Sequence, residues 1–124
     1  MLEEAIALAR EAVENLYDAT CTVIEHDQRK DPVSKETESV EIEVYHNKAC
    51  KLSYSTVKNS NQTDAANSVS QVVKIFIAPE LIIKPGSKLV ITSKGRTTEY
   101  KNSGVPAVYN THQEIVLELF NGWA

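Results

Sequence analysis

The first segment of the chain has the hydrophobic spacing of an α-helix. Between residues 2 and 18, apolar positions recur at steps of four, three, four and three, so they share one face. Acidic residues near the start suit the positive end of the helix dipole. An isolated helix of this length is marginal in water, so we expect the face to pack on the rest of the protein, or else to serve as an interface. The residues of this face are Leu2, Ile6, Ala9, Val13 and Leu16.

From Ala19 onward the pattern changes to that of short strands. Val40, Ile42 and Val44 alternate with polar or aromatic residues, which is the period of a half-buried strand. Asn47 then indicates a turn, after which the chain pairs back as a hairpin. Strands are expected at 20–24, 40–45, 49–54, 69–78, 88–93, 97–101 and 113–120.

Turn residues separate these strands. A polar loop at 27–37 contains the breaker Asp31-Pro32, Lys84-Pro85-Gly86-Ser87 forms a turn, and Lys94-Gly95-Arg96 a tight one. The pattern predicts a mainly β (α+β) fold, in which an N-terminal helix precedes an antiparallel β-barrel or sandwich of about six to seven short strands.

Residues 55–68 are predicted to form a long polar loop between two of these strands. The segment has one sizeable apolar residue, Val57, among many short polar ones. Loops longer than about 12 residues are uncommon in compact domains and are usually functional or disordered. We expect the loop to be mobile in the free protein, either as a plain insertion or as an assembly loop that orders on contact. Its candidate contact residues are Thr56, Lys58, Asn61, Thr63 and Asn67.

The 124 residues predict one soluble domain, with the helix at 2–18 and a β-rich body at 19–120. Apolar stretches reach only four or five residues, whereas a membrane span needs about 20. The first residues are acidic, unlike a secretory signal, so we expect the protein to stay in the cytoplasm. Cys21 and Cys50 each alternate with apolar residues, which favours small core residues over a disulfide or a reactive thiol.

No pattern in the sequence predicts a catalytic, cofactor or metal site. The turn Lys84–Lys88 lacks the spacing and the following helix of a phosphate loop. The histidines His26, His46 and His112 have no second ligand at a spacing typical of zinc. Acidic pairs such as Glu41 and Glu43 lie on the solvent side of a strand, where nothing apolar raises a pKa for acid catalysis.

Nucleic-acid binding is an alternative, because small OB-type barrels bind single strands through aromatic platforms and a basic groove. Basic residues do gather around two late hairpins. The chain is nevertheless acidic overall, with a net charge of −4. Its aromatic residues Phe76, Tyr100 and Tyr109 form no exposed alternating set, which weakens this alternative.

Several stretches of the sequence resemble a known family. They are residues 83–91 (Ile-Lys-Pro-Gly-Ser-Lys-Leu-Val-Ile), then Gly95 and Thr98-Glu99-Tyr100, then 106–115 (Pro-Ala-Val-Tyr-Asn-Thr-His-Gln-Glu-Ile). The opening Leu-Glu-Glu-Ala helix and the segment 17–23 point the same way. These patterns resemble the XkdH/YqbH-type proteins of PBSX-like defective prophages, small neck proteins of tailed phages. The likeness covers nearly the whole chain and is weakest at 55–68.

The resemblance implies a head-closure or head-to-tail connector, with no catalytic residue and no cofactor. Such a protein is a monomer in free solution and adds as a ring of copies below the portal, where it meets tail proteins and DNA passes only as cargo. It is made in the cytoplasm of the bacterial host and then becomes part of the phage-like particle. The acidic chain agrees with a channel that does not grip DNA. A minor capsid or tail-side protein of similar build is the other alternative.

The charge is divided unevenly along the chain. Residues 1–46 hold twelve acids against four bases, and the remainder holds nine bases against five acids. A ring requires two different faces of one protein to meet, and this division could supply them, although both sets could equally serve solubility alone. The acidic candidates are Glu38, Glu41 and Glu43, and the basic candidates are Lys84, Lys88, Lys94 and Arg96.

Overall fold

The computed structural model describes residues 2–58 and 69–123 as one helix and seven strands. The fold is mainly β, as the sequence predicted. The elements are α1 (Leu2–Glu14), β1 (Ala19–Lys30), β2 (Thr37–Lys58), β3 (Val69–Ile77), β4 (Lys88–Ser93), β5 (Arg96–Asn102), β6 (Ala107–Val108) and β7 (Gln113–Leu119).

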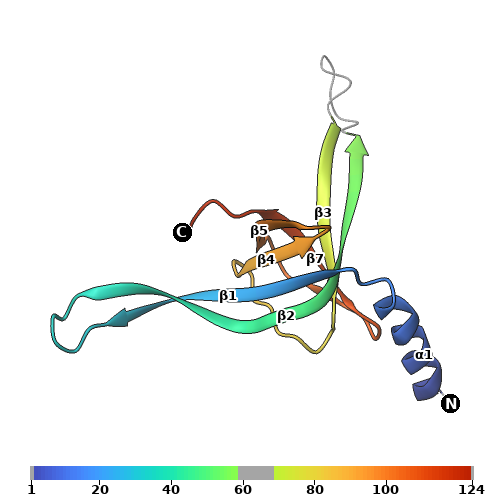
Figure 1. The fold of residues 1–124 in the computed structure, drawn as a ribbon, viewed down its shortest axis with the longest axis horizontal. Coiled ribbons are helices and arrows are strands. Elements are labelled where there is room, and N and C mark those ends of the chain that lie inside the picture. The colour runs from blue at the N-terminus through green and yellow to red at the C-terminus, as the bar shows by residue number, and fades with distance from the viewer. Residues whose placement is uncertain (1, 59–68, 124) are drawn as a thin grey trace.

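All seven strands belong to one antiparallel sheet with the order β3-β2-β1-β4-β5-β7-β6. β7 pairs with β5 and also with β3, so the sheet curls round nearly into a ring rather than a strict barrel. We call the paired region around this near-ring the body. Figure 1 shows the body at the centre, with α1 and two long hairpins leaving it in different directions.

The core of the body is formed by alternate residues of the paired strands. Ile75 and Ile77 of β3, Leu89 of β4 and Val23 of β1 have no solvent-exposed surface. Each such aliphatic side chain contributes roughly 1.5–3 kcal/mol by its burial. The full core comprises Ala19, Cys21, Val23, Cys50, Ile75, Ile77, Ile83, Leu89, Ile91, Tyr100, Ile115 and Leu117.

Both cysteines are free and lie in this core, as the alternation predicted. Burial raises the pKa of the Cys50 thiol to about 12, and burial also raises the pKa of Cys21. A thiol with a raised pKa is a poor nucleophile. The two cysteines therefore act as small core residues.

The β1–β2 hairpin is longer than the sequence predicted. β1 continues to Lys30, and only Asp31–Glu36 form the turn, so most of the loop expected at 27–37 is strand. Lys35 lies in the left-handed region with φ 61°, and the Asp31 carboxylate accepts a hydrogen bond from the Val33 amide. The Asp31-Pro32 breaker therefore lies in the turn, as predicted, but the turn is shorter than the predicted loop.

β2 is one continuous strand of 22 residues, so the hairpin expected at Asn47 is wrong. Asn47 has a positive φ of 46°, the turn signal that the sequence carried. Here the positive φ accompanies register shifts between Cys21 and Ile24 of β1, which mark a β-bulge rather than a reversal. The Asn47 amide donates to Thr22 Oγ1 over 3.2 Å, so the bulge remains tied to β1.

Two parts of the hairpins extend beyond the body. The β1–β2 ribbon consists of Glu25–Lys30 paired with Thr37–Ile42, past the last contact of β1 with β4. The β2–β3 ribbon consists of Ser55–Lys58 paired with Val69–Val72, past the last contact of β3 with β7. Since Ser55–Lys58 are strand, the polar loop predicted at 55–68 begins too early, and its remainder lies outside the described residues.

Two buried amides fasten the connection between β3 and β4 to the body. Gln113 Nε2 donates to the carbonyls of Ala78 and Leu81, both over 2.7 Å. Asn102 Nδ2 donates to the Ile83 carbonyl over 3.0 Å. The predicted turns that frame β4 are confirmed, with positive φ at Gly86, Lys94 and Gly95. No helix among the described residues is long and apolar enough to cross a membrane.

Candidate assembly surfaces

One side of helix α1 and of the turn after it is less exposed than the rest. Ile6, Arg10, Val13 and Tyr17 are half-buried, at the helical spacing of four, three and four. Arg10 Nη2 lies 2.6 Å from Glu80 Oε1, and Arg10 Nε lies 3.0 Å from Glu14 Oε1. Val13, Leu16 and Tyr17 line a hollow of about 260 Å³ against Phe76 and His112 of the body, together with Lys51.

The predicted packing of the helix stripe on the body is confirmed only in part. Ile6 and Val13 are half-buried and Leu16 lines the hollow, whereas Leu2 and Ala9 are exposed. Leu2 is 75% exposed and Leu16 62%, and no residue between Leu2 and Glu14 is fully buried. The helix also ends at Glu14 rather than Asp18. The physical reason is a rotation of the helix, because the half-buried row shares Ile6 and Val13 with the predicted stripe but also includes Arg10. A second stripe of α1 therefore faces solvent, and it comprises Leu2, Ala5, Leu8, Ala9 and Ala12.

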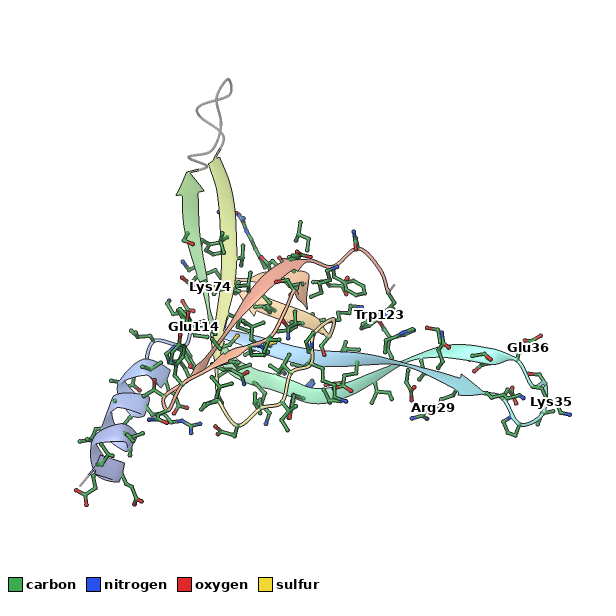
Figure 2. The ribbon with its side chains drawn as sticks, turned by 180° about the vertical axis from the view of Figure 1, so that it is seen from behind. Arg29, Lys35, Glu36, Lys74, Glu114 and Trp123 are labelled. Atoms are coloured by element: carbon green, nitrogen blue, oxygen red, sulfur yellow. The ribbon has the colours of Figure 1, made fainter. Side chains whose placement is uncertain are left out.

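The base of the β1–β2 ribbon is held by the C-terminal segment. Trp123 Nε1 donates to Glu41 Oε2 over 3.0 Å, and the Trp123 ring stacks on His26 at 4.8 Å. Phe120 packs edge-on against Trp123, and Lys88 Nζ lies 4.8 Å from the centre of the Phe120 ring. Figure 2 shows Trp123 beside the ribbon, far from Lys35 and Glu36 at the tip. We call this group of five residues the tail clasp.

Electrostatics reinforce the tail clasp. Lys88 Nζ lies 3.1 Å from Glu41 Oε2 and 3.2 Å from Glu99 Oε2, and its side chain is only 11% exposed. Hydrogen bonds from Lys88 and Trp123 lower the pKa of Glu41. The carboxylate of Glu41 therefore joins the ribbon to β4 and to the C-terminal segment at the same time.

The candidate interface charges do not divide into two opposed faces. Glu41 and Lys88, one from each set, form an ion pair with each other. Lys84 Nζ lies 3.7 Å from Glu25 Oε1, and Glu43 contacts His46. Among the residues that the structure describes, the candidates with no ion pair are Glu38, Lys94 and Arg96.

Lys94 and Arg96 border a groove of about 500 Å³ where β2 leaves the body. Leu52 and Tyr54 of β2 and the buried Ile91 of β4 line it, together with the polar residues Ser93 and Thr98. Lys51 and Asp18 stand at one end, with their charged atoms 3.9 Å apart. The groove therefore has a mixed lining of apolar and polar side chains, and three basic residues against one acidic residue border it.

Of the residues proposed for the assembly loop, Thr56 is exposed on β2 and Lys58 ends that strand. Asn61, Thr63 and Asn67 lie outside the described residues. The sequence did not predict the tail clasp, because the predicted β-rich body ends at residue 120. Two aromatic residues three positions apart, Phe120 and Trp123, are the signal for it in the sequence.

The histidines take part in side-chain contacts. His26 contacts Ser39 as well as Trp123, and His112 Nε2 lies 3.1 Å from Glu114 Oε2 beside the rings of Phe76 and Tyr109. Figure 2 shows Glu114 close to Lys74, and their charged atoms are 3.8 Å apart. The described parts of the chain contain no group of three or more His, Cys, Asp or Glu residues placed to hold a metal ion.

The architecture is a small β body from which α1 and the two ribbons project. No protein-family model matches the sequence. No curated protein matches it either. Among solved structures, the chain is similar to the phage-like element PBSX protein XkdH from Bacillus subtilis, with 8% sequence identity and a TM-score of 0.48. The match covers 81% of this chain and 91% of that one, and it is to the kind of protein that the sequence motifs resemble.

Proposed function

We propose that this chain is a structural protein of a phage-like particle, which adds as a ring below the portal and closes the head or connects it to the tail. One observation carries the proposal: α1 and two ribbons leave a small body with surfaces that the chain itself does not cover (Figure 1). A protein that must touch several neighbours at once needs such projections. The sequence motifs described above support the same role.

The distribution of buried and exposed residues supports an assembly role as well. The described core lies within the body, so the projections are free to differ in sequence without loss of the fold. Val33 at the turn of the β1–β2 ribbon is 90% exposed, and a two-stranded ribbon alone is marginally stable in water. The tail clasp stiffens the base of this ribbon, so its tip is presented in a defined direction.

Particles made without this protein test the role directly. We expect full heads that leak DNA and carry no tails in electron micrographs. Normal tailed particles would refute the proposal.

A shortened variant tests whether the ribbon acts in assembly. Gln28 and Ser39 are paired, so residues 29–38 can be replaced by Asn-Gly, a two-residue hairpin turn. The variant should keep its fold by circular dichroism and fail to restore tailed particles. Val33→Ser is the matched control, since it keeps the ribbon length and should restore them.

A further inference from the structure

The exposed stripe of α1 and the groove beside β2 are both left uncovered by the described part of the chain. The stripe presents Leu2 and Leu8 to solvent, at exposed fractions of 75% and 68%. Alanines between them leave room for close approach of another surface. Glu4 and Glu11 follow one edge of this stripe, and neither forms an ion pair among the described residues.

The groove has the opposite character at its edge. Lys94 and Arg96 are exposed and without an ion pair in the described part of the chain, and no residue of α1 is among those that line the groove. The chain's own helix is held elsewhere by Arg10 and its half-buried row. The stripe of α1 therefore does not fill the groove of its own molecule.

We infer that the exposed stripe of α1 packs into this groove of a second copy of the chain, with Glu4 and Glu11 facing Lys94 and Arg96. Leu2 and Leu8 lie about 9 Å apart along the helix axis, so both can approach one groove. The volume of about 500 Å³ holds several such side chains. Helix and groove are different faces, as a ring of identical subunits requires.

Each exposed ion pair contributes little by itself, so the contact should be weak between free copies. Around a ring assembled on a template, neighbouring copies are held close and the same contact is occupied. The inference adds a specific contact between subunits to the proposed function. It rests on that function only in assuming that the copies form a ring. The experiment below uses purified protein without particles, so its failure removes this contact and leaves the test with particles unaffected.

Two variants, each with one added cysteine, measure the contact. Leu8→Cys marks the stripe and Ser93→Cys marks the groove, while the native Cys21 and Cys50 are at most 1% exposed and do not react in the folded protein. The variants are mixed at about 1 mM and low salt, then treated with a short bismaleimide. We expect the mixed pair to cross-link more than either variant alone. A Val33→Cys variant replaces Leu8→Cys as the control and should give only background.

Charge reversal shows whether the cross-link reports this geometry. Lys94→Glu with Arg96→Glu in the groove variant should lower the yield about tenfold, and Glu4→Lys with Glu11→Lys in the helix variant should restore much of it. All four positions are exposed, so circular dichroism should be unchanged. The inference is overturned if Leu8→Cys chiefly links to itself, if the mixed pair gives only background, or if charge reversal leaves the yield unchanged.

Discussion

The body and the projections use the same apolar residue types in opposite ways. In the body, Ile75 and Leu89 have no exposed surface, because strands from both ends of the chain close around them. On α1, Leu2 and Leu8 are more than two-thirds exposed. The difference shows that local pattern makes a helix amphipathic, whereas topology decides whether its apolar face is covered. Stability should therefore depend on the body, and the projections should be nearly neutral in the isolated protein.

The largest expected effect is the difference in the free energy of unfolding between a truncated side chain in the body and one on α1. Ile75→Ala should lower the free energy of unfolding by about 2–5 kcal/mol, because it leaves a cavity in the closed core. Leu8→Ala, at an exposed position of α1, should change it by less than about 0.5 kcal/mol. Urea denaturation of both variants measures the difference. Equal losses would mean that the stripe of α1 is covered in the free protein.

The next effect concerns a polar group inside the body. Gln113→Leu should lower the free energy of unfolding by about 1–3 kcal/mol, since the carbonyls of Ala78 and Leu81 lose the hydrogen bonds from Gln113. Gln113→Glu is a sharper variant, because it keeps the shape and removes the amide donor. Thermal unfolding compares the two. A stable Gln113→Glu variant would contradict the role given to these hydrogen bonds.

The tail clasp lies where a projection meets the body, and its loss should act locally. Trp123→Ala removes the stack on His26 and the donor to Glu41, each worth about 1 kcal/mol. Amide exchange should become faster at residues 25–30 and 37–42 and stay slow at 73–77 in β3. Uniform acceleration across the protein would show instead that the clasp supports the whole fold.

The smallest effect is a pH dependence at the same place. The pKa of Glu41 is lowered in the folded protein, so its ionised form contributes stability that is complete above the unfolded pKa, about 4.3. That stability is lost as the pH falls through the lower, folded value. The Glu41 side chain is 48% exposed, so solvent screening keeps the contribution small. Glu41→Gln should show a flatter fall in melting temperature below about pH 4.5 than the unchanged protein; an identical fall in both would contradict the assignment.

Local signals in the sequence predicted most elements of the body. Alternation placed β4, β5 and β7 to within two residues, and Pro85-Gly86 and Lys94-Gly95 gave their turns. The long β2 could not be read in this way, because a positive φ at Asn47 serves a turn and a bulge equally well. Only its pairing with β1 on both sides of the bulge distinguishes the two. The polar stretch 27–30 resembles a loop, since its residues are exposed on both faces of the ribbon and show no alternation.

The candidate surfaces were harder to predict than the fold. Charge counting named Glu41 and Lys88 but placed them on separate faces, whereas their contact depends on where β1 lies between β2 and β4. The spacing of α1 predicted an amphipathic helix correctly. It could not reveal which row of that helix meets the body, because Arg10 reaches Glu80, seventy residues along the chain. Long-range contacts of this kind are set by topology.

The continuity of β2 has a consequence for how such a chain can vary in length. Pairs of residues added at either hairpin tip lengthen one ribbon and leave the core register unchanged. A single residue inserted in the middle of β2 would instead turn every later side chain to the opposite face. Insertions and deletions should therefore accumulate at the tips, and the reach of each ribbon can adapt to a new neighbour independently of the other.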